Sequence, residues 1–398
     1  MQSNSNNKKP LRKLVKPGTQ QQKNNRSKKA ALCPDLFIQQ AVAPVINQTV
    51  IKTRFEHLDL TPSLKNKILD MRFVSPTEIQ EKTLPVLLEG KNLIGIANTG
   101  TGKTGAFLIP VVERLLRNKE TKFQSLIIVP TRELALQVYD EFVKLSGGLN
   151  LRAACYIGGT NVEKDVLSLR KSADIVIGTP GRLLDLTERG ALKLSRFEVL
   201  ILDEFDKMLD MGFVRDIRKL VNGMNRRKQT ILFSATKDPK QQSIIAEIVK
   251  DPVLVEIHSG DKSSRNVDQD IIRVSDGQDK YLLLLKLLKD QEFDKVILFT
   301  ETKHLANKLA KKLNDSGIKS DQIHGNKSQN YRVSALGKFK NGSIRVLVAT
   351  DVAARGIDVN DVSLVINYQA PADFDTYIHR VGRTGRAGKT GTAYTFVD

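Results

Sequence analysis

Residues 93–104 read LIGIANTGTGKT, an apolar run that leads directly into a glycine-rich loop. The apolar run, residues 93–97, predicts a buried strand, and the apolar stretch after Lys103 predicts a helix. Between them, residues 97–104 match the phosphate-loop pattern, except that alanine replaces the first glycine. The glycines let backbone N–H groups turn inward on phosphates, at the positive end of the following helix. A chance glycine-rich loop is the alternative, but the flanking strand and helix favour a nucleotide site in an α/β fold.

The alternation of short apolar runs with amphipathic stretches continues on both sides of this loop. Such alternation predicts buried strands in a parallel sheet that helices cover on both faces. A polar stretch rich in Gly, Ser, Asp and Lys, residues 259–268, divides the pattern and reads as a hinge. The expected strands before it are residues 93–97, 125–129, 174–178, 199–202, 230–233 and 253–257. Those after it are residues 270–274, 295–300, 345–350, 363–367 and 392–397.

The charge of the chain is strongly positive. Its 398 residues carry a formal net charge of +19, and nine Lys and Arg residues fall within residues 1–30. The remainder is still basic, at about +10 (19 − 9). This excess favours a polyanionic partner such as nucleic acid, although a solvated lysine-rich surface would give the same sum. Residues 1–50 form a basic, low-complexity tail that we expect to be mostly disordered: an RNA-binding tail, a targeting signal or an inert extension.

Cysteine usage and hydropathy limit the class of protein. The two cysteines, Cys33 and Cys155, lack CxxC spacing, which argues against a disulfide or zinc framework. No run of about 18 apolar residues predicts a membrane span, and the amino terminus lacks the apolar core of a secretory signal. We therefore expect a reducing intracellular compartment, the cytoplasm first, with the nucleus or an organelle as alternatives.

An acidic pair follows another predicted strand, in the stretch VLILDE at residues 199–204. Asp203 is suited to hold Mg²⁺ through water, and Glu204 to orient and deprotonate an attacking water. In the phosphate loop, Lys103 would reach the β- and γ-phosphates and Thr104 would ligate Mg²⁺. Adjacent acids that merely end a strand are the alternative. The phosphate loop upstream favours the catalytic interpretation, with ATP and Mg²⁺ as the expected cofactors.

Two arginines lie close together after the predicted hinge. Arg383 and Arg386 are three residues apart, so on a helix they share a face and can approach one anion. In the half of the chain that carries the loop they would be ordinary surface arginines. From the other half they can act as arginine fingers, which would make hydrolysis depend on closure of two domains.

With these motifs the chain resembles a DEAD-box RNA helicase of superfamily 2, from about Phe55 to Asp398. The resemblance implies two tandem RecA-like domains: an ATP-binding domain at residues 51–258, a hinge at 259–269 and a C-terminal domain at 270–398. It also implies an RNA-dependent ATPase that clamps RNA between its domains and locally unwinds short duplexes or remodels RNA–protein complexes. The expected partner is RNA, read with little sequence specificity, and the motor is expected to be monomeric.

The resemblance assigns roles to further residues. Phe55, Phe73 and Gln80 look like the adenine-reading motif, although Thr77 and Gln80 also fit a helix capping box. The remaining nucleotide contacts would be Ala97, Asn98, Thr99, Gly100, Thr101, Gly102, Lys103 and Thr104, with Gly356 and Asp358 at the ribose. The implied RNA contacts are Pro130, Thr131, Arg132, Gly159, Thr179, Pro180, Gly181, Arg182, Gly325, Gln329, Arg332 and Thr350. The implied coupling residues are Asp206, Ser234, Thr236, His379 and Arg380.

Three positions depart from the family pattern. Phe205 replaces the usual alanine in the acidic box, Arg72 replaces a glycine, and Gln369 replaces an aspartate. Because we expect Phe205 to lie near the cleft between the domains, it could alter rate or coupling. These departures keep a second hypothesis open: an ATP-gated RNA clamp or scaffold with little productive unwinding. A translocating DNA helicase is a third and weaker reading of the motifs.

Overall fold

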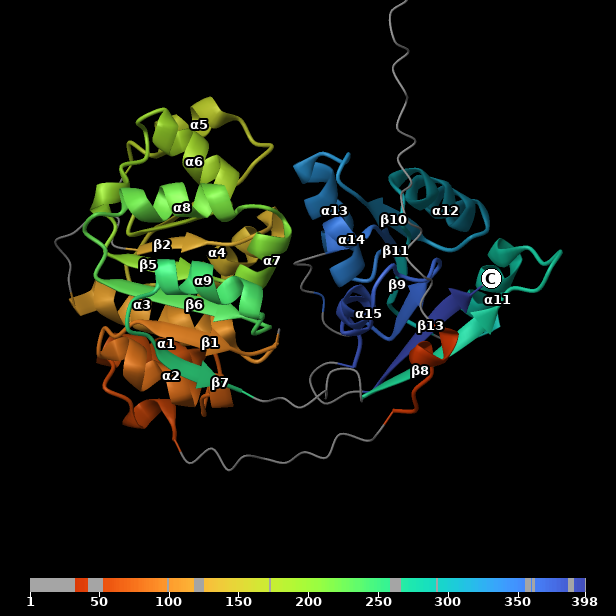
Figure 1. The fold of residues 1–398 in the computed structure, drawn as a ribbon, viewed down its shortest axis with the longest axis horizontal. Coiled ribbons are helices and arrows are strands. Elements are labelled where there is room, and N and C mark those ends of the chain that lie inside the picture. The colour runs from red at the N-terminus through yellow and green to blue at the C-terminus, as the bar shows by residue number, and fades with distance from the viewer. Residues whose placement is uncertain are drawn as a thin grey trace, which may run out of the picture. The chain divides into compact units, whose positions relative to one another are not determined.

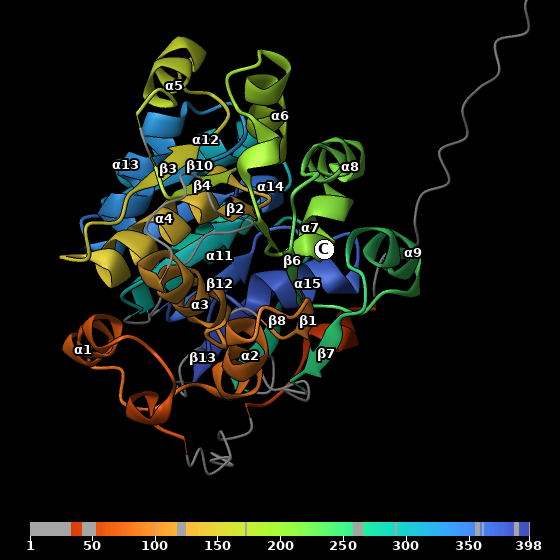
Figure 2. The same ribbon diagram turned by 90° about the vertical axis from the view of Figure 1, so that its left-hand side faces the viewer.

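The computed structural model describes residues 33–41, 53–98, 100–117, 125–171, 173–257, 266–290, 293–354, 359, 362–385 and 390–397. These residues form two parallel sheets with helices on both faces (Figures 1 and 2). None of the helices in these ranges is both long and apolar enough to cross a bilayer.

The first sheet contains seven parallel strands in the order β3-β4-β2-β5-β6-β1-β7. Its central strands are buried along their whole length because helices cover both faces, which explains their unbroken apolar sequences. The strands are β1 (Leu93–Ile96), β2 (Ser125–Ile128), β3 (Ala153–Tyr156), β4 (Ile175–Gly178), β5 (Val199–Leu202), β6 (Gln229–Ser234) and β7 (Val253–Glu256).

The helices of the first sheet divide between its two faces. The first hydrophobic cluster lies under α1 (Pro62–Asp70), α2 (Glu78–Leu88), α3 (Lys103–Arg117) and α4 (Arg132–Ser146). The second lies under α6 (Pro180–Glu188), α7 (Phe205–Asp210), α8 (Val214–Gly223) and α9 (Pro239–Ile248); α5 (Val162–Ser168) packs beside it.

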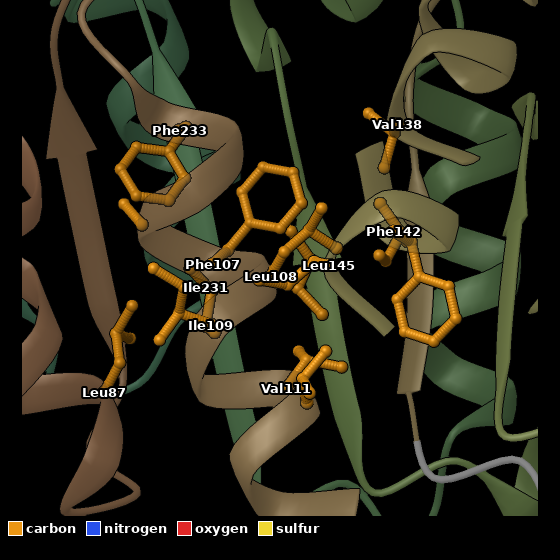
Figure 3. Close-up of a cluster of buried hydrophobic side chains, with 14 of the residues drawn as sticks. Leu87, Phe107, Leu108, Ile109, Val111, Val138, Phe142, Leu145, Ile231 and Phe233 are labelled. Atoms are coloured by element: carbon orange, nitrogen blue, oxygen red, sulfur yellow. The ribbon is translucent and has the colours of Figure 1, made fainter. Parts of the chain in front are cut away.

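Helix α3, which begins at the end of the phosphate loop, is fixed by its apolar face. Phe107 and Phe233 lie with ring centroids 6.0 Å apart, and Phe142 and Leu145 of α4 belong to the same buried cluster (Figure 3). Burial of a side chain of this size stabilises the fold by about 1.5–3 kcal/mol. The helix therefore holds its first residue, Lys103, in a fixed place at the end of β1.

The second sheet contains six parallel strands in the order β10-β11-β9-β12-β13-β8. The strands are β8 (Val267–Arg273), β9 (Val296–Phe299), β10 (Ser320–Ile323), β11 (Val346–Ala349), β12 (Leu364–Asn367) and β13 (Gly391–Val397). One face packs on α13 (Gln329–Lys340), α14 (Asp351–Ala354) and α15 (Phe374–Val381), and the other on α11 (Lys280–Asp290) and α12 (Lys303–Asp315).

The predicted parallel sheets are confirmed, but the strands β3 and β10 were not predicted, and one predicted boundary is wrong. The hinge prediction ran to residue 269, whereas β8 begins at Val267 and pairs with β13. Polar residues alternate with buried ones at the start of β8, so its sequence alone looks like a loop until it gains a partner strand. Within the predicted tail, Pro34–Phe37 forms a 3-10 helix, η1. The rest of the predicted hinge and of the tail, apart from residues 33–41, lies outside the described residues.

Candidate functional site

The phosphate loop joins β1 to α3 at the carboxyl edge of the first sheet. Gly100 and Gly102 have φ angles of +84° and +96°, in the region that side chains disfavour. A Cβ atom at Gly102 would lie 2.7 Å from the Thr77 hydroxyl oxygen. Both conformation and space therefore require glycine at position 102. Thr99 lies outside the described residues.

Lys103 and Gln80 lie against this loop. The Lys103 ammonium donates to the Ala97 carbonyl over 2.9 Å, and its side chain is buried. The Gln80 amide nitrogen donates to the Gly102 carbonyl over 2.9 Å, while the Gln80 oxygen accepts from the Thr77 N–H over 2.9 Å. The capping box is thus confirmed, and the same glutamine links it to the loop.

The aromatic residues near the loop have different exposures. Phe73 is 45% exposed, so its ring face is accessible for stacking on a base. Phe55 is 1% exposed, and its backbone N–H donates to the Val74 carbonyl. We therefore revise the prediction for Phe55: its ring is part of the core and supports the Phe73 loop from beneath. Arg72 has a φ of +62°, a left-handed conformation that costs an ordinary residue roughly 1–2 kcal/mol and that glycine adopts freely.

Asp203 and Glu204 follow β5, which is fully buried. Burial raises the pKa of Asp203 to about 6, against the opposing attraction of Lys103. Its Oδ1 accepts a hydrogen bond from the Glu204 N–H over 2.9 Å. Glu204 has a φ of +51°, a strained conformation that turns its side chain away from the line of the strand.

Lys207 contacts the predicted general base. Its ammonium lies 2.7 Å from Glu204 Oε1, and both side chains are buried. Burial opposes ionisation of Glu204, but the attraction and hydrogen bond of Lys207 and the charge of Lys103 are among the causes that together outweigh it, so the pKa of Glu204 is lowered. Glu204 Oε2 has no hydrogen-bond partner among the described residues. Sequence reasoning missed Lys207, although an i,i+3 acid–lysine pair at the start of α7 was a usable signal.

Asp206 joins the acidic stretch to the loop that follows β6. Its Oδ2 accepts from the N–H groups of Ala235 and Thr236 at 2.9 and 3.1 Å, and from the Thr236 hydroxyl at 3.3 Å. The predicted hydroxyl contact with the acidic box is confirmed for Thr236. Ser234 instead donates to the Thr236 carbonyl over 3.0 Å, which fixes the turn.

Phe205 packs inward from the acidic stretch. Its side chain is fully buried in the second hydrophobic cluster, together with Met208 of the same helix and Leu202 of β5. The larger side chain is therefore accommodated in the core, and an effect on rate or coupling stays a prediction. The extra volume of Phe over Ala fills the core of the first sheet beneath α7.

Most of the first-sheet residues predicted to bind RNA lie at one edge of the sheet, and Arg182 is the exception. Pro130, Thr131, Arg132, Gly159, Thr179, Pro180 and Gly181 lie on loops or helix starts at the carboxyl ends of β2, β3 and β4. The Arg132 guanidinium fills the space beside Gly159, where a Cβ would approach it to 2.6 Å. Thr131 caps α4 by accepting from the Leu134 N–H. This edge of the sheet offers N–H groups and one close-packed arginine.

Arg182 is engaged within the fold. Its guanidinium donates to the Thr160 hydroxyl and carbonyl at 3.0 and 2.9 Å, and it forms an ion pair with Asp165 of α5. Only 8% of its side chain is exposed. We therefore replace the predicted phosphate contact of Arg182 with a structural role, which sequence reasoning could not see because Asp165 is seventeen residues upstream.

The second-sheet residues are also engaged. Gln329 donates to Glu133 over 3.1 Å, and Arg332 pairs with the same carboxylate at 3.0 Å. The Thr350 N–H donates to the Ile323 carbonyl at the end of β11, and Gly325 lies in the loop after β10. Glu133 was not predicted, since a single acid in a helix carries no signal of its partners.

Arg380 and Arg383 lie at the end of α15. Arg380 pairs with Asp351 through two contacts of 2.6 and 2.8 Å and donates to the Asn367 amide oxygen and the Gln369 carbonyl. Arg383 is buried and follows directly, its N–H donating to the Arg380 carbonyl, while His379 is exposed. Gly356, Asp358 and Arg386 lie outside the described residues.

The two cysteines should differ in reactivity. Cys33 is exposed, whereas burial raises the pKa of the Cys155 thiol to about 12, with the negative charges of Asp140 and Asp165 adding to the effect. Since the thiolate is the nucleophile, we expect a thiol reagent at pH 8 to modify one cysteine in the native protein and two in urea. Two fast-reacting thiols in the native state would contradict the burial of Cys155.

Models of two protein families match the chain: DEAD/DEAH box helicase at residues 77–244 and helicase conserved C-terminal domain at residues 279–388. The chain is 42% identical over 345 residues to the DEAD-box ATP-dependent RNA helicase CshA of Geobacillus kaustophilus, covering 87% of this chain and 73% of the relative. It is 44% identical over 344 residues to CshA of Streptococcus pneumoniae, covering 86% of this chain and 65% of that relative.

The fold of the chain is also similar to that of a solved structure. The structure of S. cerevisiae Dbp5 bound to RNA and ADP BeF3 superposes with a TM-score of 0.76 at 32% identity, covering 86% of this chain and 89% of that one. Together with the phosphate loop, the acidic stretch and the ordered motifs of both sheets, these similarities assign the chain to a family. It belongs to the DEAD-box ATP-dependent RNA helicases.

Proposed function

We propose that the chain hydrolyses ATP to clamp RNA, open short duplexes locally and remodel RNA–protein complexes. The observation that carries this proposal is the constellation at the edge of the first sheet: a glycine loop with Lys103, beside a buried carboxylate pair. The Dbp5 structure, which carries RNA and ADP BeF3, supports the same reading for a related fold. In this proposal residues 51–258 and 267–398 act as two domains, the second beginning with β8.

The nucleotide is held by backbone and side-chain donors of the first domain. Phe73 stacks on adenine, Gln80 stands between the base edge and the loop, and the loop N–H groups surround the phosphates. Lys103 leaves the Ala97 carbonyl and donates to the β- and γ-phosphates, where its charge is better neutralised. Gly356 and Asp358 complete the ribose side.

The donor set at the end of β5 suits Mg²⁺. Thr104 and Asp203 offer only oxygen ligands, which this ion prefers, and it commonly takes one or two carboxylates beside water and phosphate oxygens. When bound, Mg²⁺ neutralises charge on the phosphates. Its charge would add to that of Lys103 in favouring the ionised form of Asp203.

Glu204 is the proposed general base. Its lowered pKa keeps it ionised at neutral pH, and Oε2, which lacks a partner, is the atom that can accept a proton from the attacking water. The Lys207 ammonium fixes Oε1 and so orients the carboxylate. Arg383 and Arg386 supply positive charge to the γ-phosphate from the second domain.

RNA binding is proposed to use backbone contacts at both sheets. The proposed contacts are N–H groups, hydroxyls and cations. They come from Thr131, Arg132 and Gly159 of the first sheet and from Gly325, Gln329, Arg332 and Thr350 of the second. Such groups hold phosphates without reading bases. Affinity should therefore fall steeply with salt and depend little on sequence. Because both cysteines are free thiols, we place this activity in the reducing cytoplasm.

Asp206 gives a test of coupling. Replacing Asp206 by alanine removes the acceptor for three donors on the loop after β6, and leaves Asp203 and Glu204 in place. We expect duplex release to fall by roughly tenfold or more, and ATP hydrolysis by much less, since the loop loses its link to the acidic stretch. Parallel loss of both activities would show that Asp206 has no separate coupling role.

An RNA clamp without productive unwinding remains the second candidate. The observation that keeps it open is Arg72, which departs from the family pattern and has a φ of +62° beside Phe73. Strand release from a short RNA duplex decides between the two functions. RNA binding and ATP hydrolysis with no strand release would identify the clamp.

A further inference from the structure

Residues 33–41 lie along the edge of the second sheet, although they precede the first sheet in the chain (Figure 1). Gln39 and Gln269 of the edge strand β8 exchange both backbone hydrogen bonds, at 2.9 and 2.7 Å, in antiparallel pairing. The Ala41 N–H donates to Asp268 Oδ1 over 2.7 Å. An extended segment that adds to a sheet edge in this way is a recognised mode of peptide binding.

A single side chain anchors this segment. Phe37 is 0% exposed and belongs to the buried cluster beneath α13–α15, whereas its neighbours Leu36 and Ile38 are each 50% exposed. Its ring lies 4.6 Å from the ring of Tyr377, centroid to centroid. Of these three adjacent apolar side chains, only Phe37 fills a place in the core.

Polar contacts join the same partners. The Tyr377 hydroxyl donates to Gln269 Oε1 over 2.7 Å, and the Gln269 amide nitrogen donates to Gln39 Oε1 over 3.2 Å. Gln269 and Tyr377 are both buried. The segment is therefore linked to α15 twice, by ring packing and by this hydrogen-bonded chain.

Helix α15 carries Arg380 in its last turn, and Arg383 follows two residues after the helix ends at Val381. One turn further on, Arg380 is fixed by Asp351 and Asn367, so the contacts of Tyr377 hold the preceding turn of the helix against β8. We propose that residues 33–41 form a docked strap that positions α15, and through it Arg383, with Phe37 as the positioning residue. This rests on the role proposed above for Arg383.

A strap that only covered the open edge of β8 would protect against aggregation without affecting turnover. The two roles differ in one readout. Misplacing a catalytic group by a fraction of an ångström lowers the rate of the chemical step and leaves ground-state binding almost unchanged. The positioning role therefore predicts a fall in kcat, with KM for ATP and RNA affinity retained.

The experiment uses the full chain with Phe37→Ala, assayed for ATP hydrolysis at saturating RNA. We expect kcat to fall roughly tenfold and KM for ATP to change less than twofold. Amide hydrogen exchange in residues 374–381 should rise. Phe37→Leu, which restores most of the apolar volume, should recover most of kcat, and Leu36→Ala, the matched exposed control, should behave like the wild type.

A second variant separates docking from core packing. Gln39→Pro removes the N–H that donates to the Gln269 carbonyl and leaves Phe37 unchanged; we expect the same direction of effect. Unchanged kcat in both Phe37→Ala and Gln39→Pro would overturn the proposal. A loss of kcat that depends on protein concentration would overturn docking within one chain in favour of exchange between copies. If the wild type lacked RNA-stimulated ATPase, the proposed function would fail, while increased exchange in α15 of Phe37→Ala would still report the docking.

Discussion

Replacing Glu204 by glutamine should lower kcat for RNA-stimulated ATP hydrolysis by roughly 10²–10⁴-fold, the usual contribution of a general base. The amide keeps the shape of the side chain but cannot accept the proton from water. It also removes the charge that pairs with Lys207, whose ammonium lies 2.7 Å away. ATP binding should persist, because the loop and Lys103 are untouched. A steady-state phosphate-release assay measures the effect.

The control for this substitution is Glu188→Gln, an exposed acid at the end of α6. It removes the same charge at a surface site, where Glu188 pairs with the exposed Lys219, and should leave kcat within twofold of the wild type. If Glu204→Gln retained more than a tenth of the wild-type kcat, Glu204 would not be the base. Equal losses in both variants would point to a general effect of charge.

Replacing Arg380 by alanine should destabilise the second sheet by about 3–5 kcal/mol, as expected when one partner of a buried ion pair is lost. Its side chain is 2% exposed and serves four acceptor atoms: both carboxylate oxygens of Asp351, the Asn367 amide oxygen and the Gln369 carbonyl. The guanidinium also lies over the ring of Phe299, 5.2 Å from its centroid. Urea unfolding of the full chain gives the change in midpoint.

An exposed cation on the same sheet provides the comparison. Lys308→Ala, on the outer face of α12, should change the free energy of unfolding by less than about 0.5 kcal/mol. If Arg380→Ala unfolded at the wild-type midpoint and lost only activity, Arg380 would not stabilise the second sheet. It would then be a coupling residue, as the sequence suggested.

The architecture was predictable because it depends on periodicity. Apolar runs of strand length, separated by helical patterns, predicted the strands of both sheets except the edge strands β3 and β10, and the glycine loop predicted the nucleotide site. The strand β8 was predicted only in part, from residue 270. Its start is polar at alternate positions and becomes a strand only through pairing with β13, which is a tertiary effect that no local pattern reports.

Side-chain roles were less predictable because they depend on partners distant in sequence. Arg182 matched an RNA motif, yet Asp165 and Thr160 occupy its guanidinium. Phe55 matched a nucleotide motif, yet its ring is in the core. Phe205 was expected to affect the rate or coupling of ATP hydrolysis, yet its side chain packs within a hydrophobic cluster of the first sheet. In each case the residue type was informative, but its direction in space was not.

The central claim is that ATP turnover at Lys103 and Glu204 drives the release of RNA strands. Its most direct test is release of a short labelled strand from an RNA duplex, with ATP and Mg²⁺, by the wild type and by Lys103→Ala. We predict ATP-dependent release by the wild type, and a loss of roughly 10²-fold or more in the variant, since Lys103 stabilises the charge that develops on the phosphates. No release by the wild type, or equal release by both proteins, would contradict the account.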